Sequence, residues 1–94
     1  MEPVTVEVKL PLTLRRLTGG ASTVTAAGET VADVIEELGR RHAGFRERVL
    51  DGDGRLLTNM HVYLNGDDVR YRDGLATRLS AGDRLQIIPA AAGG

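Results

Sequence analysis

The sequence contains no cysteine and no tryptophan. Without cysteine the chain has no disulfide, no thiolate ligand for a metal and no thiol nucleophile of its own. Aromatic residues are equally scarce, since Phe45, Tyr63 and Tyr71 are the only ones among 94 residues. Three aromatic side chains are too few for a platform on which nucleic-acid bases stack. The composition therefore excludes thiol chemistry by this chain and argues against a single-stranded nucleic-acid binder.

An excess of positive charge is missing as well. Twelve basic and thirteen acidic residues leave a net charge of -1, whereas a nucleic-acid binder needs a clustered positive face. No apolar run approaches the roughly 18 residues of a membrane-spanning helix. The start, Met1-Glu2-Pro3, lacks the basic and apolar regions of a signal peptide. We therefore expect a cytoplasmic protein that binds neither nucleic acid nor membrane.

Candidate catalytic and metal-binding groups are also few. His42 and His61 are the only histidines, and no third ligand or serine stands at a spacing that makes a metal site or a triad. Residues 51–54 (Asp-Gly-Asp-Gly) resemble the start of a calcium loop. The fifth and twelfth positions of that loop would hold Arg55 and Val62 in place of an oxygen ligand and a glutamate. We predict no metal site, no catalytic residue and no cofactor bound by this chain, and we do not expect an enzyme.

Alternating apolar and polar residues predict several half-buried strands. The first places Val4, Val6, Val8 and Leu10 on one face. Asn65-Gly66 is a strong hairpin signal between a strand and a short return segment. The expected strands cover residues 4–10, 22–26, 60–64 and 84–88, and the return segment covers residues 67–71.

One main helix is expected to begin at Thr30, which can cap it, with Asp33 three residues later. Its apolar side chains recur at helical spacing and form a stripe for packing against the sheet. These are Val31, Val34, Ile35 and Leu38. We place its end at residues 42–44, where Gly44 suits a C-terminal cap. Another short helical turn is expected over residues 45–50, and residues 12–17 are expected to be a connection.

This order of elements indicates an α+β fold, a mixed sheet of four to five strands with one main helix packed across it. The first and last strands would pair side by side in the centre, and we expect the chain end to leave at a sheet edge. A chain of 94 residues suffices for a single core, so one domain accounts for residues 1–89. Residues 90–94 form a flexible C-terminal tail.

The tail, Ala90-Ala91-Ala92-Gly93-Gly94, is built from small residues. Two glycines without a β-carbon make a thin end with a pliable backbone, and five extended residues span at most about 17 Å. Such a tail can thread a narrow channel and carry the carboxyl group of Gly94 into another protein's active site. Taken alone, its residues fit a frayed chain end equally well.

An ordered set of further segments resembles the ubiquitin-like β-grasp sulfur carriers, the MoaD/ThiS-like family. Residues 14–20 (LRRLTGG) are similar to the segment after strand one of molybdopterin-synthase small subunits. Residues 62–71 (VYLNGDDVRY), 74–77 (GLAT) and 87–94 (IIPAAAGG) resemble the actinobacterial sulfur carriers of cysteine synthesis. Ala91 departs from this pattern, which often has valine there.

The resemblance implies a β-grasp fold and a sulfur carrier in which Gly94 bears the sulfur as a terminal thiocarboxylate. An E1-like adenylating and sulfurtransferase enzyme would activate the carboxylate with ATP, while Gly93, Ala92, Ala91 and Ala90 thread its channel. A sulfur-acceptor enzyme would then take the sulfur. For cysteine synthesis, the leading pathway, the acceptor is a pyridoxal-phosphate enzyme similar to cysteine synthase, and a metalloprotease frees the cysteine.

Three residues are candidates for partner docking. Tyr63 and Ile88 have the outward parity of their strands, and we expect Arg70 to border them; ordinary surface scatter is the alternative for the two apolar side chains. Other functions stay open, namely sulfur supply to the molybdopterin synthase large subunit or to a thiosugar or other natural-product synthase. The chain could also be a ubiquitin-like modifier conjugated through Gly94, or an interaction domain with an incidental diglycine.

Overall fold

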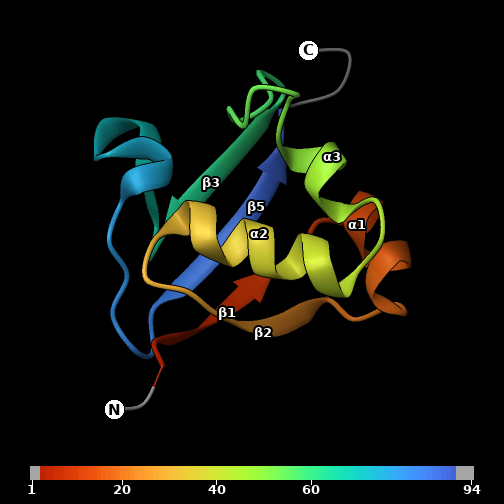
Figure 1. The fold of residues 1–94 in the computed structure, drawn as a ribbon, viewed down its shortest axis with the longest axis horizontal. Coiled ribbons are helices and arrows are strands. Elements are labelled where there is room, and N and C mark those ends of the chain that lie inside the picture. Colours follow the sequence, from red (N-terminus) through yellow and green to blue (C-terminus); the bar gives the residue numbers. More distant parts are fainter. Residues whose placement is uncertain (1–2, 91–94) are drawn as a thin grey trace.

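The protein, described here from residue 3 to residue 90 by a computed structural model, is built on a five-stranded sheet crossed by one main helix (Figure 1). The strands are β1 (Thr5–Lys9), β2 (Thr23–Ala27), β3 (Met60–Leu64), β4 (Asp67–Asp68) and β5 (Arg84–Pro89). The α-helices are α1 (Leu12–Arg15), α2 (Val31–Arg41) and α3 (Phe45–Val49). Short 3-10 turns cover Arg16–Thr18, Val69–Tyr71 and Gly74–Ala76.

The sheet is mixed, with strand order β2-β1-β5-β3-β4. β1 and β5 pair in parallel, and the other neighbours are antiparallel. The predicted α+β class and the central pairing of the first and last strands are both confirmed. β5 is the middle strand, so the chain leaves the sheet from the end of a central strand. The expectation of an exit at a sheet edge was wrong.

The core lies between the sheet and α2. Every second residue of β1 and β3 is buried, so one face of these strands points toward the helix. Phe45, at the start of α3, is fully buried and closes one end of this core. The hairpin between β3 and β4 turns at Asn65 and Gly66, whose φ angles of 50° and 93° are both positive. A type I′ turn needs this pair of conformations, as the sequence predicted.

α2 begins where the sequence places it. The side chain of Thr30 accepts a hydrogen bond from the backbone N–H of Asp33 at 3.2 Å, which satisfies one of the free donors of the first turn. The helix ends at Arg41, and His42 rather than Gly44 is its C-terminal cap. Gly44 has a φ of 86° and instead precedes α3, where it turns the chain from one helix into the next.

Residues 12–17, expected to be a connection, are mostly helical. Pro11 is extended and precedes α1, and the N–H of Leu14 donates to the oxygen of Pro11 at 3.0 Å. Leu14 is buried in the core. Tertiary burial of this one side chain supports a turn of helix that has no capping or periodic signal of its own. Among residues 3–90, no helix combines the length and hydropathy needed to cross a bilayer.

Candidate functional site

The root of the predicted tail is the end of β5. Pro89 pairs with Met60 of β3, and the N–H of Ala90 donates to the backbone oxygen of Asn59 at 2.6 Å. Ala90, which the sequence assigned to the tail, is therefore tied to the segment before β3. The remaining predicted tail residues lie outside the described part of the chain: Ala91, Ala92, Gly93 and Gly94.

The face of the sheet that points away from the core carries two of the predicted docking residues. Leu85 and Ile87 of β5 are buried, whereas Ile88 has the opposite parity to Ile87 and is half-buried. His61 of β3 lies directly across from Ile88. Tyr63 is two residues further along β3 and shares this face because side chains alternate along a strand. The structure thus brings Ile88 and Tyr63 to one surface beside the tail root.

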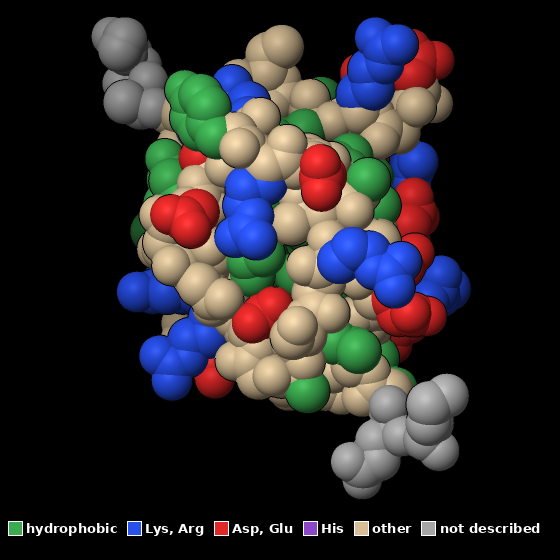
Figure 2. Space-filling view, turned by 90° about the vertical axis from the view of Figure 1, so that its left-hand side faces the viewer, with side chains coloured by type: hydrophobic (Ala, Val, Ile, Leu, Met, Phe, Trp, Pro, Cys, Tyr) green, Lys and Arg blue, Asp and Glu red, His purple; other side chains and the backbone are tan. Residues whose placement is uncertain are grey.

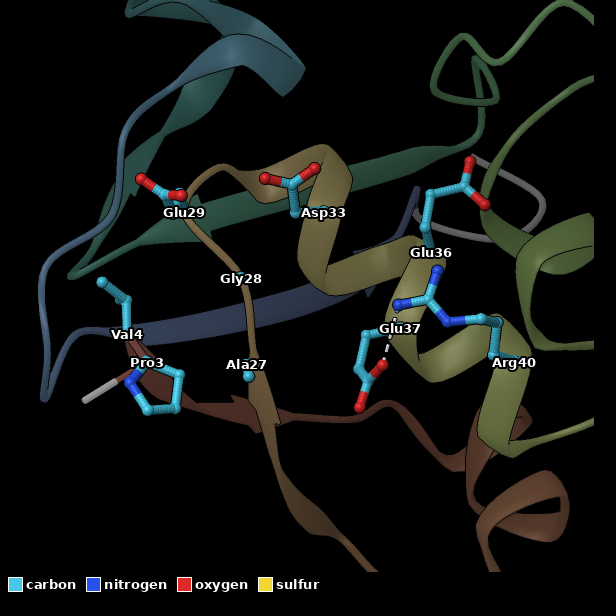
Figure 3. A pocket seen from close by; sticks show the side chains of 9 residues that line it. All are labelled: Pro3, Val4, Ala27, Gly28, Glu29, Asp33, Glu36, Glu37 and Arg40. Carbon is cyan, nitrogen blue, oxygen red and sulfur yellow. Dashed lines mark hydrogen bonds and ion pairs between the residues drawn. The ribbon is translucent and has the colours of Figure 1, made fainter. Parts of the chain in front are cut away.

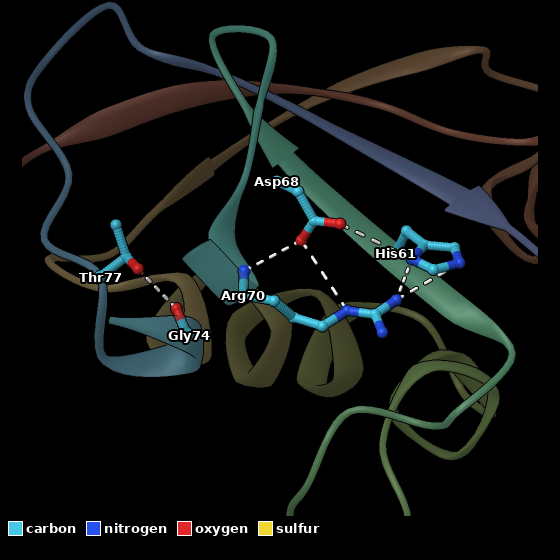
Figure 4. Close-up of polar contacts among 5 residues, drawn as sticks. All are labelled: His61, Asp68, Arg70, Gly74 and Thr77. Carbon is cyan, nitrogen blue, oxygen red and sulfur yellow. Dashed lines mark hydrogen bonds and ion pairs between the residues drawn. The ribbon is translucent and has the colours of Figure 1, made fainter. Parts of the chain in front are cut away.

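His61 connects the third docking candidate, Arg70, to this surface (Figure 4). Nη2 of Arg70 contacts Nδ1 of the His61 ring and lies 3.3 Å from Nε2. The Asp68 carboxylate lies against both residues, since Oδ1 accepts the N–H of Arg70 at 2.9 Å and Oδ2 lies 3.8 Å from Nδ1 of His61. We call Ile88, His61, Tyr63 and Arg70 the outer-face surface. His61 was not predicted as a docking residue, although its even spacing from Tyr63 already placed it on the same strand face.

α1 borders the tail root from another side. Its Thr13 and Leu14 line a shallow hollow together with Asn59, Met60 and Pro89. Leu12, at the start of this helix, is 76% exposed. A single exposed leucine is ordinary on a protein surface and by itself indicates no docking site. The sequence predicted no helix here, so neither the inward side chain of Leu14 nor the outward one of Leu12 was expected.

A separate hollow lies between the end of β2 and α2 (Figure 3). β2 ends opposite the beginning of β1, whereas the tail leaves from the end of the parallel β5, so this hollow and the tail root are at opposite ends of the sheet. Its helix wall carries Glu37, paired with Arg40 at 2.8 Å, and Glu36, paired with Arg46 at 2.9 Å. These are solvated surface ion pairs of small energetic weight, and they indicate no ligand.

The rejected calcium loop is a turn. Oδ1 of Asp51 accepts the N–H groups of Asp53 and Arg55 at 2.8 and 3.0 Å. These bonds, chiefly the one from Arg55, hold the pKa of Asp51 below its usual value, against a weaker opposing effect of burial. Within residues 3–90, no three histidine or carboxylate side chains gather as a metal site.

Figure 2 shows basic and acidic side chains interspersed over one side of the molecule, so that side presents no continuous positive field for nucleic acid.

Known proteins resemble nearly the whole chain. A sequence model described as the ThiS family matches residues 8–94. The "Sulfur carrier protein CysO" of Mycobacterium tuberculosis (strain H37Rv) is 42% identical over 91 residues, which cover 95% of this chain and 98% of that protein. The "Small archaeal modifier protein 3" of Haloferax volcanii is 32% identical with the same coverage.

The fold has close counterparts among solved structures. A chain in the crystal structure of the Amycolatopsis orientalis BexX/CysO complex superposes with a TM-score of 0.88 at 42% identity. The match covers 95% of this chain and 99% of that one. These similarities confirm the β-grasp fold and the family resemblance that the sequence motifs indicated.

Proposed function

The chain belongs to the ThiS family of β-grasp sulfur carriers, and we propose that the carboxylate of Gly94 is the group that carries the sulfur. The observation that carries this proposal is the family match, which runs through the diglycine to residue 94. The chain is a carrier and not an enzyme, so the reactions on Gly94 take place in partner active sites.

The chemistry needs an activated acyl group. Attack of the Gly94 carboxylate on ATP, bound by an E1-like partner, gives an acyl adenylate and releases pyrophosphate. Sulfide, or a protein-bound equivalent, then attacks the carbonyl carbon, and AMP leaves with the electron pair of the broken C–O bond. The product is a thiocarboxylate, whose anionic sulfur is a strong nucleophile. Holding that sulfur on a recognisable protein delivers it to one acceptor at high effective concentration.

This chain's contribution is presentation of the tail. β5 is paired on both sides, in parallel with β1 and antiparallel with β3, so the strand that leads into the tail is fixed by the fold. Small side chains at residues 91 and 92 and two glycines keep the tail thin enough for a narrow channel. Gly93, Ala92 and Ala91 are the residues we assign to that channel, because Ala90 is hydrogen-bonded to Asn59 of the domain.

Partners dock on the outer-face surface in this proposal. Ile88 lies one residue before Pro89 and across from His61, so an enzyme that covers this face is placed at the tail root. Ile88 is half-buried, shares its sheet face with Tyr63, and lies across from His61, which Arg70 contacts. Isoleucine, tyrosine and arginine on one surface have the composition of an interface centre. Replacing Ile88 by alanine should raise the KM for loading about tenfold, or ~1.4 kcal/mol.

The control for Ile88→Ala is Arg40→Ala. Arg40 is exposed on α2, which covers the opposite face of the sheet, and it lines the hollow at the far end from the tail root, so its replacement should leave loading unchanged. Equal thermal stability of both variants would show that the loss is one of docking. A wild-type KM for Ile88→Ala would contradict this assignment of the surface.

We propose a cytoplasmic carrier that supplies cysteine synthesis, which is the pathway implied by the resemblance of residues 62–71, 74–77 and 87–94. The 42% identity to the M. tuberculosis "Sulfur carrier protein CysO" supports the carrier role. The acceptor would then be a pyridoxal-phosphate enzyme of the cysteine-synthase type, and a metalloprotease would free the cysteine. The test is to offer the loaded carrier to each candidate acceptor, including the molybdopterin synthase large subunit and a thiosugar synthase. The acceptor that consumes the thiocarboxylate fastest identifies the pathway, and consumption only by the latter two would overturn cysteine synthesis.

A second function rests on the Haloferax volcanii relative, which is named a modifier protein. The same acyl adenylate, attacked by a lysine amine of a target, would give an isopeptide bond and release AMP. Heavier target proteins that contain this chain, formed with ATP and lost on deletion of Gly94, would support conjugation. Lys9 is the single lysine of the chain, so linked copies of the carrier would have to join through that residue or the N-terminus.

A further inference from the structure

β5 ends in Pro89, and the next residue, Ala90, still donates a backbone hydrogen bond to the segment before β3. At the β4 side of the β3–β5 ladder the N–H of Asn65 donates to the oxygen of Arg84, and at the tail side Ala90 donates to Asn59. In an antiparallel pair hydrogen-bonded positions alternate with unbonded ones. Pro89, opposite Met60, therefore occupies a position that needs no N–H toward β3. Pro89 therefore removes no hydrogen bond from the β3–β5 ladder, and Ala90 donates the bond that follows it.

The pairing of β5 with β1 ends earlier along the strand than its pairing with β3. β1 pairs with β5 only as far as Lys9 opposite Gln86, and the chain then turns into α1. Pro89 has no N–H with which to extend a parallel pairing. Beyond Gln86 no residue of β5 has a partner in β1, whereas the pairing with β3 continues to Pro89. The bond from Ala90 to Asn59, 2.6 Å long, follows that pairing at the last described residue.

The acceptor, the Asn59 carbonyl, belongs to a well-anchored loop. The N–H of Leu57 donates to the oxygen of Val49 in α3 at 2.9 Å, and the N–H of Met60 donates to the oxygen of Leu57 at 3.0 Å. Leu50 and Leu56 form a β-bridge across the base of the same loop. A carbonyl held in this way fixes the position of Ala90 relative to the folded domain.

We infer that the Ala90–Asn59 bond is the pivot of the tail and positions Gly94 for its partners. The arm beyond the pivot is four residues long, which sets a maximum reach of about 14 Å. A partner docked on the domain then receives the Gly94 carboxylate at a fixed depth in its active site. Ala90 is a positioning residue that acts through its backbone N–H. This inference rests on the proposed function of Gly94.

The test removes that N–H in two different ways. Ala90 is replaced by lactic acid through nonsense suppression, which exchanges the amide for an ester, and Ala90→Pro serves as a second variant without the donor. Ala90→Gly keeps the N–H and is the matched control. Loading of Gly94 by the activating enzyme should fall about tenfold in kcat, with KM changed by less than about twofold, in both variants that lack the donor. Ala90→Gly should load like the wild type.

Two further measurements separate a pivot from a merely structural contact. The amide hydrogen of Ala90 should exchange more slowly in the free carrier than the amide of an unstructured chain, because it donates to the Asn59 carbonyl. Insertion of one glycine after Ala90 keeps the bond and lengthens the arm, and it should also lower kcat.

The outcomes are distinct. Wild-type loading of the ester variant, or of the insertion variant, would overturn the pivot while leaving the carrier function intact. Exchange of the Ala90 amide at the rate of an unstructured chain would show that the bond itself is absent in solution and would overturn the pivot as well. A wild-type chain that is never loaded would instead contradict the proposed function.

Discussion

Gly28, at the junction of β2 and α2, is the position where the structure leaves least room for a side chain (Figure 3). A β-carbon added there would lie 2.9 Å from Cβ of Asp33 and 2.9 Å from both Cγ2 and the backbone nitrogen of Val34. Two of these three atoms belong to the helix framework and cannot rotate away, so the start of α2 must shift. Overpacking of this kind costs about 1–3 kcal/mol. For a domain of this size a cost of about 2 kcal/mol lowers Tm by roughly 8–16 °C.

Thermal unfolding of Gly28→Ala, followed by circular dichroism, measures this cost. Gly52→Ala is the matched control, because a β-carbon there meets nothing within 4 Å and the φ of Gly52 is outside the left-handed region. That change should be neutral or stabilise by about 0.4–1 kcal/mol through the unfolded state. If Gly28→Ala melts with the wild type, α2 does not pack on the end of β2 as described, and the reasoning is refuted.

Three other changes have defined outcomes. Thr30→Ala removes the side chain that accepts the N–H of Asp33 and should lower the free energy of unfolding, measured by urea denaturation, by about 1 kcal/mol. Thr30→Ser should be close to wild type. An unchanged urea midpoint for Thr30→Ala would exclude the cap. Phe45→Ala empties a fully buried site and should cost about 3–5 kcal/mol, and a loss below about 1 kcal/mol would contradict its place in the core. Because backbone N–H groups lower the pKa of Asp51 in the folded state, its carboxylate stabilises the fold above the unfolded-state pKa. That stabilisation is lost as pH falls through the lower folded-state pKa. Asp51→Asn should therefore be less stable than wild type at neutral pH and equal to it in strong acid, and a pH-independent difference would contradict the assignment.

Local signals in the sequence were sufficient for most elements. The strand over residues 60–64 and the turn at Asn65-Gly66 were predicted with the bounds that the structure shows, because alternation and positive φ are properties of neighbouring residues. The role of Thr30 as the N-terminal cap of α2 was predicted for the same reason, because it depends on residues three positions apart. The central pairing of β1 with β5 followed from the order of elements rather than from any single residue.

Features that depend on strand register or on distant packing were not predictable. Contact between His61 and Arg70 requires the β3–β4 pairing and the 3-10 turn after it, and neither is encoded in the spacing of the two residues. The bond from Ala90 to Asn59 depends on which residues of β5 face β3 in hydrogen-bonding positions. α1 was missed because its one inward side chain, Leu14, is stabilised by the core and not by its own segment.

The central claim is that Gly94 carries the sulfur. The most direct test incubates the protein with its activating enzyme, ATP and a sulfur source, and then locates the modification by fragmentation in a mass spectrometer. We expect that one oxygen is replaced by sulfur, that the change maps to the terminal carboxyl group of Gly94, and that it is absent when Gly94 is deleted. An unchanged mass under conditions that load the M. tuberculosis relative, or a modification elsewhere in the chain, would contradict it.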